Sequence, residues 1–438
     1  MKKIFSISFA ALSAMLVGLT ACNKTPQPVV VPEPEVPGGM LFVNLTPDNG
    51  GTTKADAASL TAMQSEVRSI QVFVFSAETN ASLGLVADQI ETSKFISGNS
   101  ISNATGGTAT SNPIALTTYL GKKKVFALVN APRQDNVTTI SQLMGRVSHL
   151  SENYITDATV DGISRQGMVM AGAYGYNYTA TSEGKGIEIS PTVLDVVNKY
   201  DSKDDTSIYA VDIPVYRLGA RIEVGSVTVN FNETDLRGKT LTIKDIKLKN
   251  VVNAVTFGGG NSAQLSTPNY WSMRLATTGA NAGTYVDYSG ASVSDKLQDT
   301  GLSIACTEGT PVAVNKSFIV YPNPCDDPAG LSAPGSSAAT TWSVRRTRLV
   351  IHAQIDGTED TYYAFAIADP ANLAGGQSDN NGSFKYLVGN RRYVIDNINI
   401  SMKGKPNDDD DMLPATGRIS ATVKVQDWAG QTLLTYQF

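Results

Sequence analysis

The chain has 438 residues with a formal net charge of −5 at neutral pH, and it contains three cysteines and two histidines. This length gives room for two domains, because a single domain usually takes about 100 to 200 residues. The acidic balance excludes the basic surface that nucleic acid or anionic lipid needs, so we expect no nucleic-acid partner.

The chain begins with a charged and then apolar segment, residues 1–22. Lys2 and Lys3 precede a run of apolar and small residues that ends in Leu19-Thr20-Ala21-Cys22. This pattern predicts a signal peptide with a lipobox, in which Cys22 becomes the acylated N-terminus and anchors the protein in a membrane by lipid alone. The alternative is an ordinary secretory peptide with a chance cysteine. No later stretch reaches the roughly 20 apolar residues of a transmembrane helix.

Residues 23–39 are rich in proline and predict a semi-rigid tether that holds the body away from the membrane. After it, short runs of alternating apolar and polar residues predict β-strands separated by loops rich in Gly, Ser, Thr, Asn and Pro. The runs lie at 70–75, 124–129, 222–229, 241–248, 317–321, 348–355 and 393–400.

This spacing predicts an all-β fold of two tandem antiparallel β-sandwich domains with few short helices. We expect the N-terminal domain over residues 40–210, the C-terminal domain over 211–402, and a linker with a final strand over 403–438. The boundary is placed near 201–212, where a charged, loop-like segment precedes new strands. The best helix candidate is 140–150, where apolar residues recur at helical spacing.

Two cysteines remain once Cys22 is lipidated. In an oxidising envelope, a disulfide between Cys306 and Cys325 is one alternative. Sequence alone does not show whether their Cα atoms come within disulfide distance. The paired and the free states both stay open.

We find no catalytic or metal-binding pattern, and we expect neither an enzyme nor a cofactor. His149 and His352 lie far apart in sequence, which favours ordinary packed or surface histidines. Gly238-Lys239-Thr240 lacks the first glycine and the following helix of a phosphate-binding loop, so it predicts a turn. Asp408 to Asp411 lack the ligand spacing of a calcium loop and favour a solvated linker.

Strand patterns also lie at the two ends of the mature chain. Near the start, Leu41, Val43 and Leu45 alternate within a short run that leads into the loop 46–59. At the end, apolar residues alternate from Ile419 onward and resume after Asp427-Trp428-Ala429-Gly430. A tail of this kind, after a flexible linker, is suited to adding itself to another sheet.

Along most of its length the chain resembles the fimbrillin family, the lipoprotein-derived subunits of type V pili of Gram-negative anaerobes. The most specific feature is the tail that contains Trp428. The resemblance is also carried by the lipobox and by the segments 70–75, 125–130, 167–171, 216–222 and 391–396.

The resemblance implies two β-sandwich domains and assembly by strand exchange. In the family, a trypsin-like surface protease cuts the loop after the first strand, and the C-terminal strand of the next subunit fills the groove that this strand leaves. For this chain it implies a removable strand with Leu41, Val43 and Leu45, and a cut between Lys54 and Ala55. The implied donor-strand contacts are Val423, Val425, Trp428, Leu434, Tyr436 and Phe438.

The resemblance therefore implies a structural subunit of a surface fimbria that supports adhesion. Its partners would be other fimbrial subunits, the protease, the outer membrane through the lipid, and ligands on host or bacterial surfaces. The protein would start as an outer-membrane lipoprotein and end in the surface fimbrium. The family usually presents Arg at the cut, whereas this chain has Lys54, so an uncleaved anchor or accessory subunit is an alternative.

Two further alternatives stay open at this point. The tail from Ile419 has the same alternation as a last strand of the domain's own sheet. A glycan-binding surface lipoprotein would instead use exposed aromatic platforms, and the candidates for these are Trp271, Trp342, Tyr174, Tyr176 and Tyr178.

Overall fold

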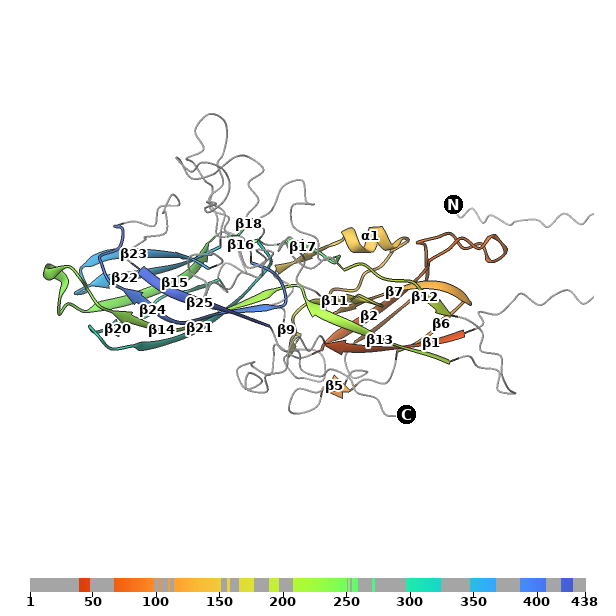
Figure 1. The fold of residues 1–438 in the computed structure, drawn as a ribbon, viewed down its shortest axis with the longest axis horizontal. Helices are drawn as coiled ribbons and strands as arrows, with labels where there is room; N and C mark the ends of the chain where they lie inside the picture. Colours follow the sequence, from red (N-terminus) through yellow and green to blue (C-terminus); the bar gives the residue numbers. More distant parts are fainter. Residues whose placement is uncertain are drawn as a thin grey trace, which may run out of the picture. The chain divides into compact units, whose positions relative to one another are not determined.

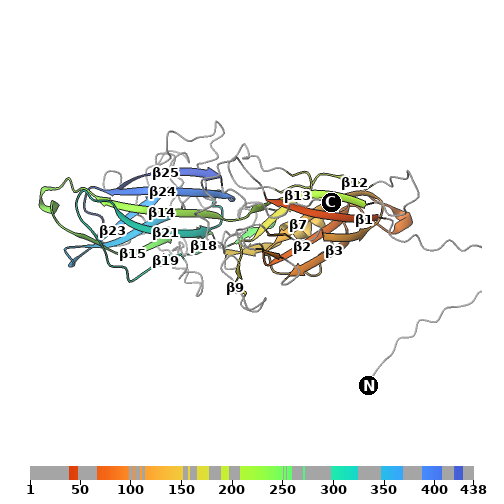
Figure 2. The same ribbon diagram turned by 90° about the horizontal axis from the view of Figure 1, so that it is seen from below.

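The structure is a computed structural model, drawn as a ribbon in Figure 1 and turned by 90° in Figure 2. It describes residues 39–47, 67–97, 102–103, 109–110, 114–150, 156–157, 165–176, 189–196, 208–249, 251–252, 254–258, 270–271, 297–323, 347–367, 387–406 and 419–427. These described residues lie mainly in β-strands. The predicted all-β class with antiparallel sandwiches and few short helices is confirmed.

One sheet collects strands from the first half of the chain. They are β1 (Gly39–Pro47), β2 (Ser69–Ser76), β3 (Ile90–Ser97), β6 (Ile114–Thr118), β7 (Gly121–Val129), β11 (Met170–Ala173), β12 (Leu194–Val196) and β13 (Ile208–Arg217). The order is β3-β2-β7-β11-β13-β1-β6, and β12 pairs with β7. We call it the first sheet. Its ladders are antiparallel except for the parallel pair of β1 and β13.

The first sheet is buried on both faces along β2 because apolar residues occupy successive positions there. Val72 and Val74 pack in one apolar cluster with the inward side chains of β1. Phe73 and Phe75 point to the opposite face, since successive strand side chains alternate, and belong to a second cluster. The helix α1 (Ile140–Gly145) contributes Ile140 and Leu143 to that second cluster.

The second half of the chain forms two further sheets. One has the order β21-β14-β24-β25, from β14 (Ala220–Val229), β21 (Val312–Val320), β24 (Arg391–Ile400) and β25 (Ile419–Asp427). The other has the order β19-β15-β22-β23, with β20 beside β15. Its strands are β15 (Leu241–Lys249), β19 (Gln298–Asp299), β20 (Ile304–Cys306), β22 (Arg348–Ile355) and β23 (Glu359–Ala366).

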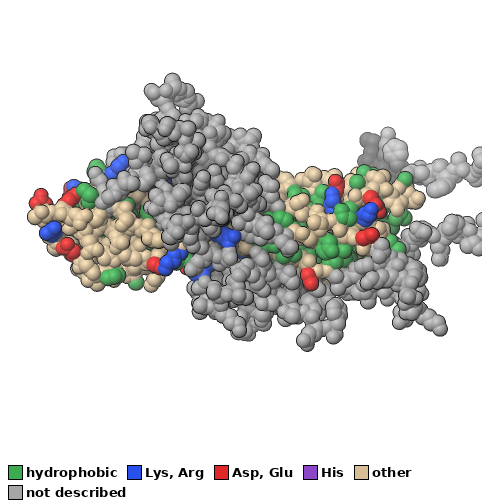
Figure 3. All heavy atoms as spheres, in the orientation of Figure 1, with side chains coloured by type: hydrophobic (Ala, Val, Ile, Leu, Met, Phe, Trp, Pro, Cys, Tyr) green, Lys and Arg blue, Asp and Glu red, His purple; other side chains and the backbone are tan. Residues whose placement is uncertain are grey.

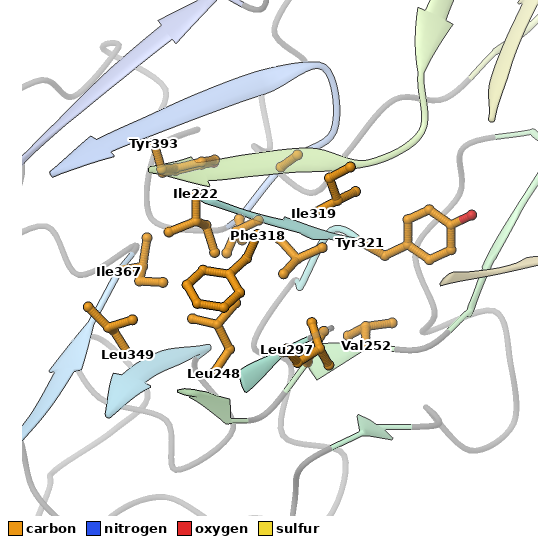
Figure 4. Packing of buried hydrophobic residues seen from close by; sticks show 14 of the residues in the cluster. Ile222, Leu248, Val252, Leu297, Phe318, Ile319, Tyr321, Leu349, Ile367 and Tyr393 are labelled. Carbon is orange, nitrogen blue, oxygen red and sulfur yellow. The ribbon is translucent and has the colours of Figure 1, made fainter. Parts of the chain in front are cut away.

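These two sheets share an apolar core. Ile222 and Tyr393 come from β14 and β24, whereas Leu248 and Leu349 come from β15 and β22, and all four belong to one buried cluster. In Figure 4, Phe318 of β21 lies between Ile222 and Leu248. This is the face-to-face packing of a β-sandwich.

Short elements complete the described fold. Two-stranded pairs are β4 (Ser102–Asn103) with β5 (Ala109–Thr110), β8 (Val147–His149) with β17 (Ala254–Thr256), β9 (Thr156–Asp157) with β10 (Arg165–Gln166), and β16 (Val251–Val252) with β18 (Tyr270–Trp271). Two 3-10 turns lie at Ala81–Leu83 and Thr234–Leu236. None of the helices within the described residues is long and apolar enough to cross a membrane.

The predicted helix over 140–150 is too long. α1 ends at Gly145 and the chain turns into β8, which forms a ladder with β17. Ser148 on β8 is fully buried, and its hydroxyl lies 2.6 Å from that of Tyr321. Tertiary pairing therefore overrides the helical spacing of the apolar residues here.

The predicted boundary near 201–212 stays a prediction. The segment 201–207 lies outside the described residues, and β13 belongs to the first sheet up to Arg217. The turn predicted at Gly238 is present, with a positive φ of 78°.

Candidate functional site: the slot occupied by the first strand

The strand β1 lies inside the first sheet, between β13 and β6. It runs parallel to β13, where Val43 faces Val211, and antiparallel to β6, where Val43 faces Ile114. The backbone of β1 is therefore in a ladder on both sides. We call this strand position between β13 and β6 the slot.

The inward side chains of β1 are the three residues predicted for a removable strand. Leu41, Val43 and Leu45 are 0%, 1% and 1% exposed. They pack in one cluster with residues of β2, β6, β7 and β13. Burying each such side chain contributes about 1.5–3 kcal/mol, or about 5–9 kcal/mol for the three as an upper estimate. The slot is thus lined by apolar side chains and is filled by this chain's own first strand.

The wall formed by β6 depends on β1. Among the described strands, β6 has its ladder only with β1, and its Ile114 and Leu116 point into the same apolar cluster. Side chains connect β6 to β3 as well, since Lys94 Nζ donates to the Ala115 carbonyl oxygen at 3.1 Å. Loss of β1 would leave unpaired backbone groups along both β13 and β6, together with an uncovered apolar floor.

A buried polar cluster closes one end of the slot. The Lys123 ammonium group of β7 lies 2.5 Å from Glu91 Oε1 of β3, and both side chains are 1% exposed. The hydroxyl of Thr118, at the end of β6, donates to Glu91 Oε2 at 2.7 Å. We call Glu91, Lys123 and Thr118 the polar end of the slot. Sequence reasoning missed this cluster. A signal was available, because Lys123 occupies an alternate position whose next members, Val125 and Ala127, are apolar.

The described half of the predicted donor strand is paired in its own sheet. β25 forms an antiparallel ladder with β24, in which Val423 faces Ile395 and Val425 faces Tyr393. Val423 is fully buried. Trp428, Leu434, Tyr436 and Phe438 lie outside the described residues. The segment from Ile419 to Asp427 is thus a strand of this chain's own sheet. The donor role of the tail stays a prediction.

The other processing residues lie outside the described residues. These are the lipidation site Cys22 and the two residues of the cut, Lys54 and Ala55. Cys306 is buried, and burial raises the pKa of its thiol to about 11. Cys325 also lies outside the described residues, so its pairing with Cys306 stays a prediction.

The two histidines have unrelated surroundings. His149 is an exposed residue of β8. His352 lies on β22 between two carboxylates, 2.6 Å from Asp245 and 2.9 Å from Asp360, and it stacks on Tyr362. Hydrogen bonds from His352 lower the pKa of Asp360. Within the described ranges, no cluster of His, Cys, Asp and Glu has the arrangement to hold a metal ion.

Two of the aromatic residues considered as glycan platforms, Tyr174 and Tyr176, have described side chains. Tyr176 packs edge-on against the buried Tyr216, with ring centroids 5.5 Å apart. Tyr174 packs against the cluster that contains β1. Trp271 belongs to β18, and Trp342 and Tyr178 lie outside the described residues. On the face drawn in Figure 3, charged side chains of both signs are scattered over the described parts.

Two arginines that carry the family resemblance meet in the second half of the chain. Arg221 on β14 lies 2.8 Å from Glu223. Arg392 on the neighbouring strand β24 donates to both oxygens of the same carboxylate, at 3.0 and 2.9 Å. Because β14 and β24 are parallel neighbours far apart in sequence, this two-pronged contact ties them together. The segments 216–222 and 391–396 are thus connected through Glu223, which directly follows the first of them.

Comparison with known proteins gives a match at the level of fold. No protein-family model and no curated protein sequence matches the chain. Among solved structures, a fimbrilin from Porphyromonas gingivalis matches with a TM-score of 0.52 at 14% identity, covering 91% of this chain and 99% of that one. The chain shares the fimbrillin-like fold. A protein described as a cell adhesion protein, from Parabacteroides distasonis, matches with the same TM-score of 0.52 at 14% identity, covering 92% and 99%.

A second cell adhesion protein from Parabacteroides distasonis matches with a TM-score of 0.51 at 15% identity, covering 89% of this chain and 99% of that one. These alignments cover 89–92% of this chain, which agrees with a resemblance along most of its length. Identities of this size establish the fold, and the function of this chain needs an argument from its own residues.

Proposed function

We propose that this chain is a structural subunit of a cell-surface fimbria that assembles by donor-strand exchange and supports adhesion. The observation that carries the proposal is the place of β1. A strand close to the start of the mature chain fills an interior position of the first sheet, and one stretch, residues 48–66, connects it to β2. A cut in that stretch would release β1 without breaking any other chain connection. The fimbrilin and cell adhesion proteins that share the fold support this proposal.

The sequence between β1 and β2 offers a trypsin-like protease two basic residues, Lys54 and Arg68. Arg68 is held in the structure: its backbone N–H donates to Asn130 Oδ1 at 2.6 Å and its guanidinium group donates to the Asn130 carbonyl oxygen at 3.1 Å. A protease needs an extended, accessible chain, so Arg68 is a poor substrate. We infer that the cut falls after Lys54, which leaves Ala55 as the new N-terminus.

The guest in the vacated slot would be the tail of another fimbrial subunit. Backbone ladders with β13 and β6 would provide strength, and alternate apolar side chains would enter the positions of Leu41, Val43 and Leu45. β25 is paired with β24 of the same chain up to Asp427. The donor contacts that remain for exchange therefore lie beyond Asp427, and they are Trp428, Leu434, Tyr436 and Phe438.

Export as a lipoprotein fits this course of assembly. Acylated Cys22 would hold the precursor in the outer membrane, and the Pro-rich residues 23–38 before β1 would carry the first sheet outward. The cut after Lys54 would remove lipid, tether and β1 together. The subunit would leave the membrane and open its slot in one step.

The test is to treat the folded precursor with trypsin, to read the N-terminus of the large product by mass spectrometry, and to look for ladders of oligomers. We expect a product that starts at Ala55 and forms oligomers. Lys54→Ala should abolish both, whereas Lys24→Ala, the same change in the tether before β1, should leave both intact. Fimbriae that contain this chain with lipid-bearing Cys22 and β1 in place would refute exchange and support the anchor alternative.

A further inference from the structure

The polar end of the slot has a position that bears directly on β1. Thr118 faces Gly39 in the ladder between β6 and β1, one alternation before the pair of Leu41 and Leu116. Strand side chains alternate, so position 39 lies on the same face as Leu41 and Val43. A side chain at position 39 would therefore point toward the hydroxyl of Thr118 and the Glu91 and Lys123 charges behind it.

The backbone of β3 is shaped to place the carboxylate there. In the ladder of β2 with β3, Val74 faces Thr92 and the next residue, Phe75, faces Ile90. Glu91 is the extra residue of a β-bulge between them. A bulge bends its strand and redirects a side chain. Here the side chain of Glu91 ends up buried against Lys123, at the end of an otherwise apolar cluster.

Removing two charges from water is costly, and the best-attested use of such a buried pair is to fix a register. Register needs fixing here, because alternation allows a strand to slide by two residues with its apolar face still inward. A slide of β1 by two residues toward the polar end would put Leu41 opposite Thr118, in place of Gly39. The leucine would then press on the buried ion pair and displace its hydrogen-bonding partners.

We propose that Glu91, Lys123 and Thr118 form a register stop for the strand that occupies the slot. The stop admits a residue without a side chain, Gly39 in β1, and excludes a large apolar one. It also acts on the guest strand, and this extension rests on the proposed function: the tail of a second subunit must present a small residue at the polar end. The three residues thus determine which registers, and which tails, fit the slot.

Disulfide trapping in the uncut chain reads the register of β1 directly. In the native register position 42 faces 115, and after the slide it would face 117. Phe42→Cys with Ala115→Cys reports the native register, and Phe42→Cys with Thr117→Cys reports the slid one, since facing Cα atoms in a ladder are within disulfide reach. The background carries Cys22→Ser, Cys306→Ala and Cys325→Ser.

With the polar end intact, we expect the native pair to form and the slid pair to stay at background. In the double variant Glu91→Met with Lys123→Met, the ratio of slid to native pair should rise at least about tenfold, which corresponds to about 1.4 kcal/mol. An unchanged ratio in a folded double variant, or a slid pair that forms equally well with the charges present, would overturn the proposal.

A second comparison keeps the test valid if the double variant does not fold. Leu41→Ser and Leu45→Ser make the same change at two equally buried positions of β1. Only Leu41→Ser relieves the conflict in the slid register, because position 41 is the one that reaches the polar end. The slid pair should therefore increase in Leu41→Ser and not in Leu45→Ser, and equal yields would contradict the stop. Neither outcome depends on cleavage or polymerisation, so failure of strand exchange would be seen separately.

Discussion

Replacing Leu41 by Ala tests whether β1 is an integral part of the first sheet. The side chain is fully buried, and ladders with β13 and β6 hold the backbone of β1 on both sides. The neighbours cannot collapse into the space left by the missing atoms without breaking a ladder. We therefore expect a loss in the free energy of unfolding of about 3–5 kcal/mol, the upper part of the range for such truncations.

The assay is a urea titration read by pulsed hydrogen exchange and mass spectrometry of the peptides that cover β2 and β7. These peptides report the first sheet, while those of β14 and β24 report the second half of the chain and should be unchanged. Thr117→Ala, on the exposed face of β6, is the matched control and should change the value by less than about 0.5 kcal/mol. A loss below about 1 kcal/mol in Leu41→Ala would refute the view that β1 is packed in the slot.

Three further predictions follow from the described contacts. In the same titration, Glu91→Ala should cost about 3–5 kcal/mol because it leaves the Lys123 charge buried and unpaired, whereas Glu91→Met with Lys123→Met should be close to neutral. The raised pKa of Cys306, about 11 against an ordinary value near 9, keeps the thiol protonated at pH 8. An alkylating reagent should therefore modify Cys306 at least about a hundredfold faster in unfolding urea than in buffer. Equal rates would contradict the burial of this thiol. Deleting residues 428–438 should leave the thermal midpoint of unfolding unchanged while blocking assembly. Deleting residues 419–438 should lower the midpoint because it uncovers Ile395 on β24. A lowered midpoint in the shorter deletion would place the distal tail in the subunit's own core.

The strands themselves were predictable because alternation is a local signal. The runs at 70–75, 222–229 and 393–400 lie inside β2, β14 and β24, whose alternating residues reach the core. For Leu41, Val43 and Leu45, the place in a removable strand was implied by the family resemblance, and their burial agrees with the alternation of the run 41–45. A pattern of period two fixes which side chains point inward, and in these strands it was sufficient.

Pairing partners and polar contacts were not predictable in this way. The parallel ladder of β1 with β13 joins segments about 170 residues apart. Neither segment has a sequence feature that indicates its pairing partner. Glu91 is placed by a bulge, which shifts the alternation by one residue and makes its inward direction invisible to a period-two pattern. Val423 shows a further limit of sequence patterns. The alternation of apolar residues is the same for a strand in its own sheet and for a strand added to the sheet of a neighbouring subunit.

On the proposed function, the sheet order gives a reason why β1 stays in place until the cut. Without β1, the strands β13 and β6 would both present unpaired backbone groups beside an uncovered apolar floor. Such edges pair with any extended chain, including a second copy in the wrong register. With three buried side chains and two ladders, β1 suppresses this while it fills the slot, and the proposed register stop would limit the registers open to a new strand. On the proposed function, wrong pairing would be suppressed before the cut because β1 fills the slot, and after the cut because the polar end restricts the register of the guest strand.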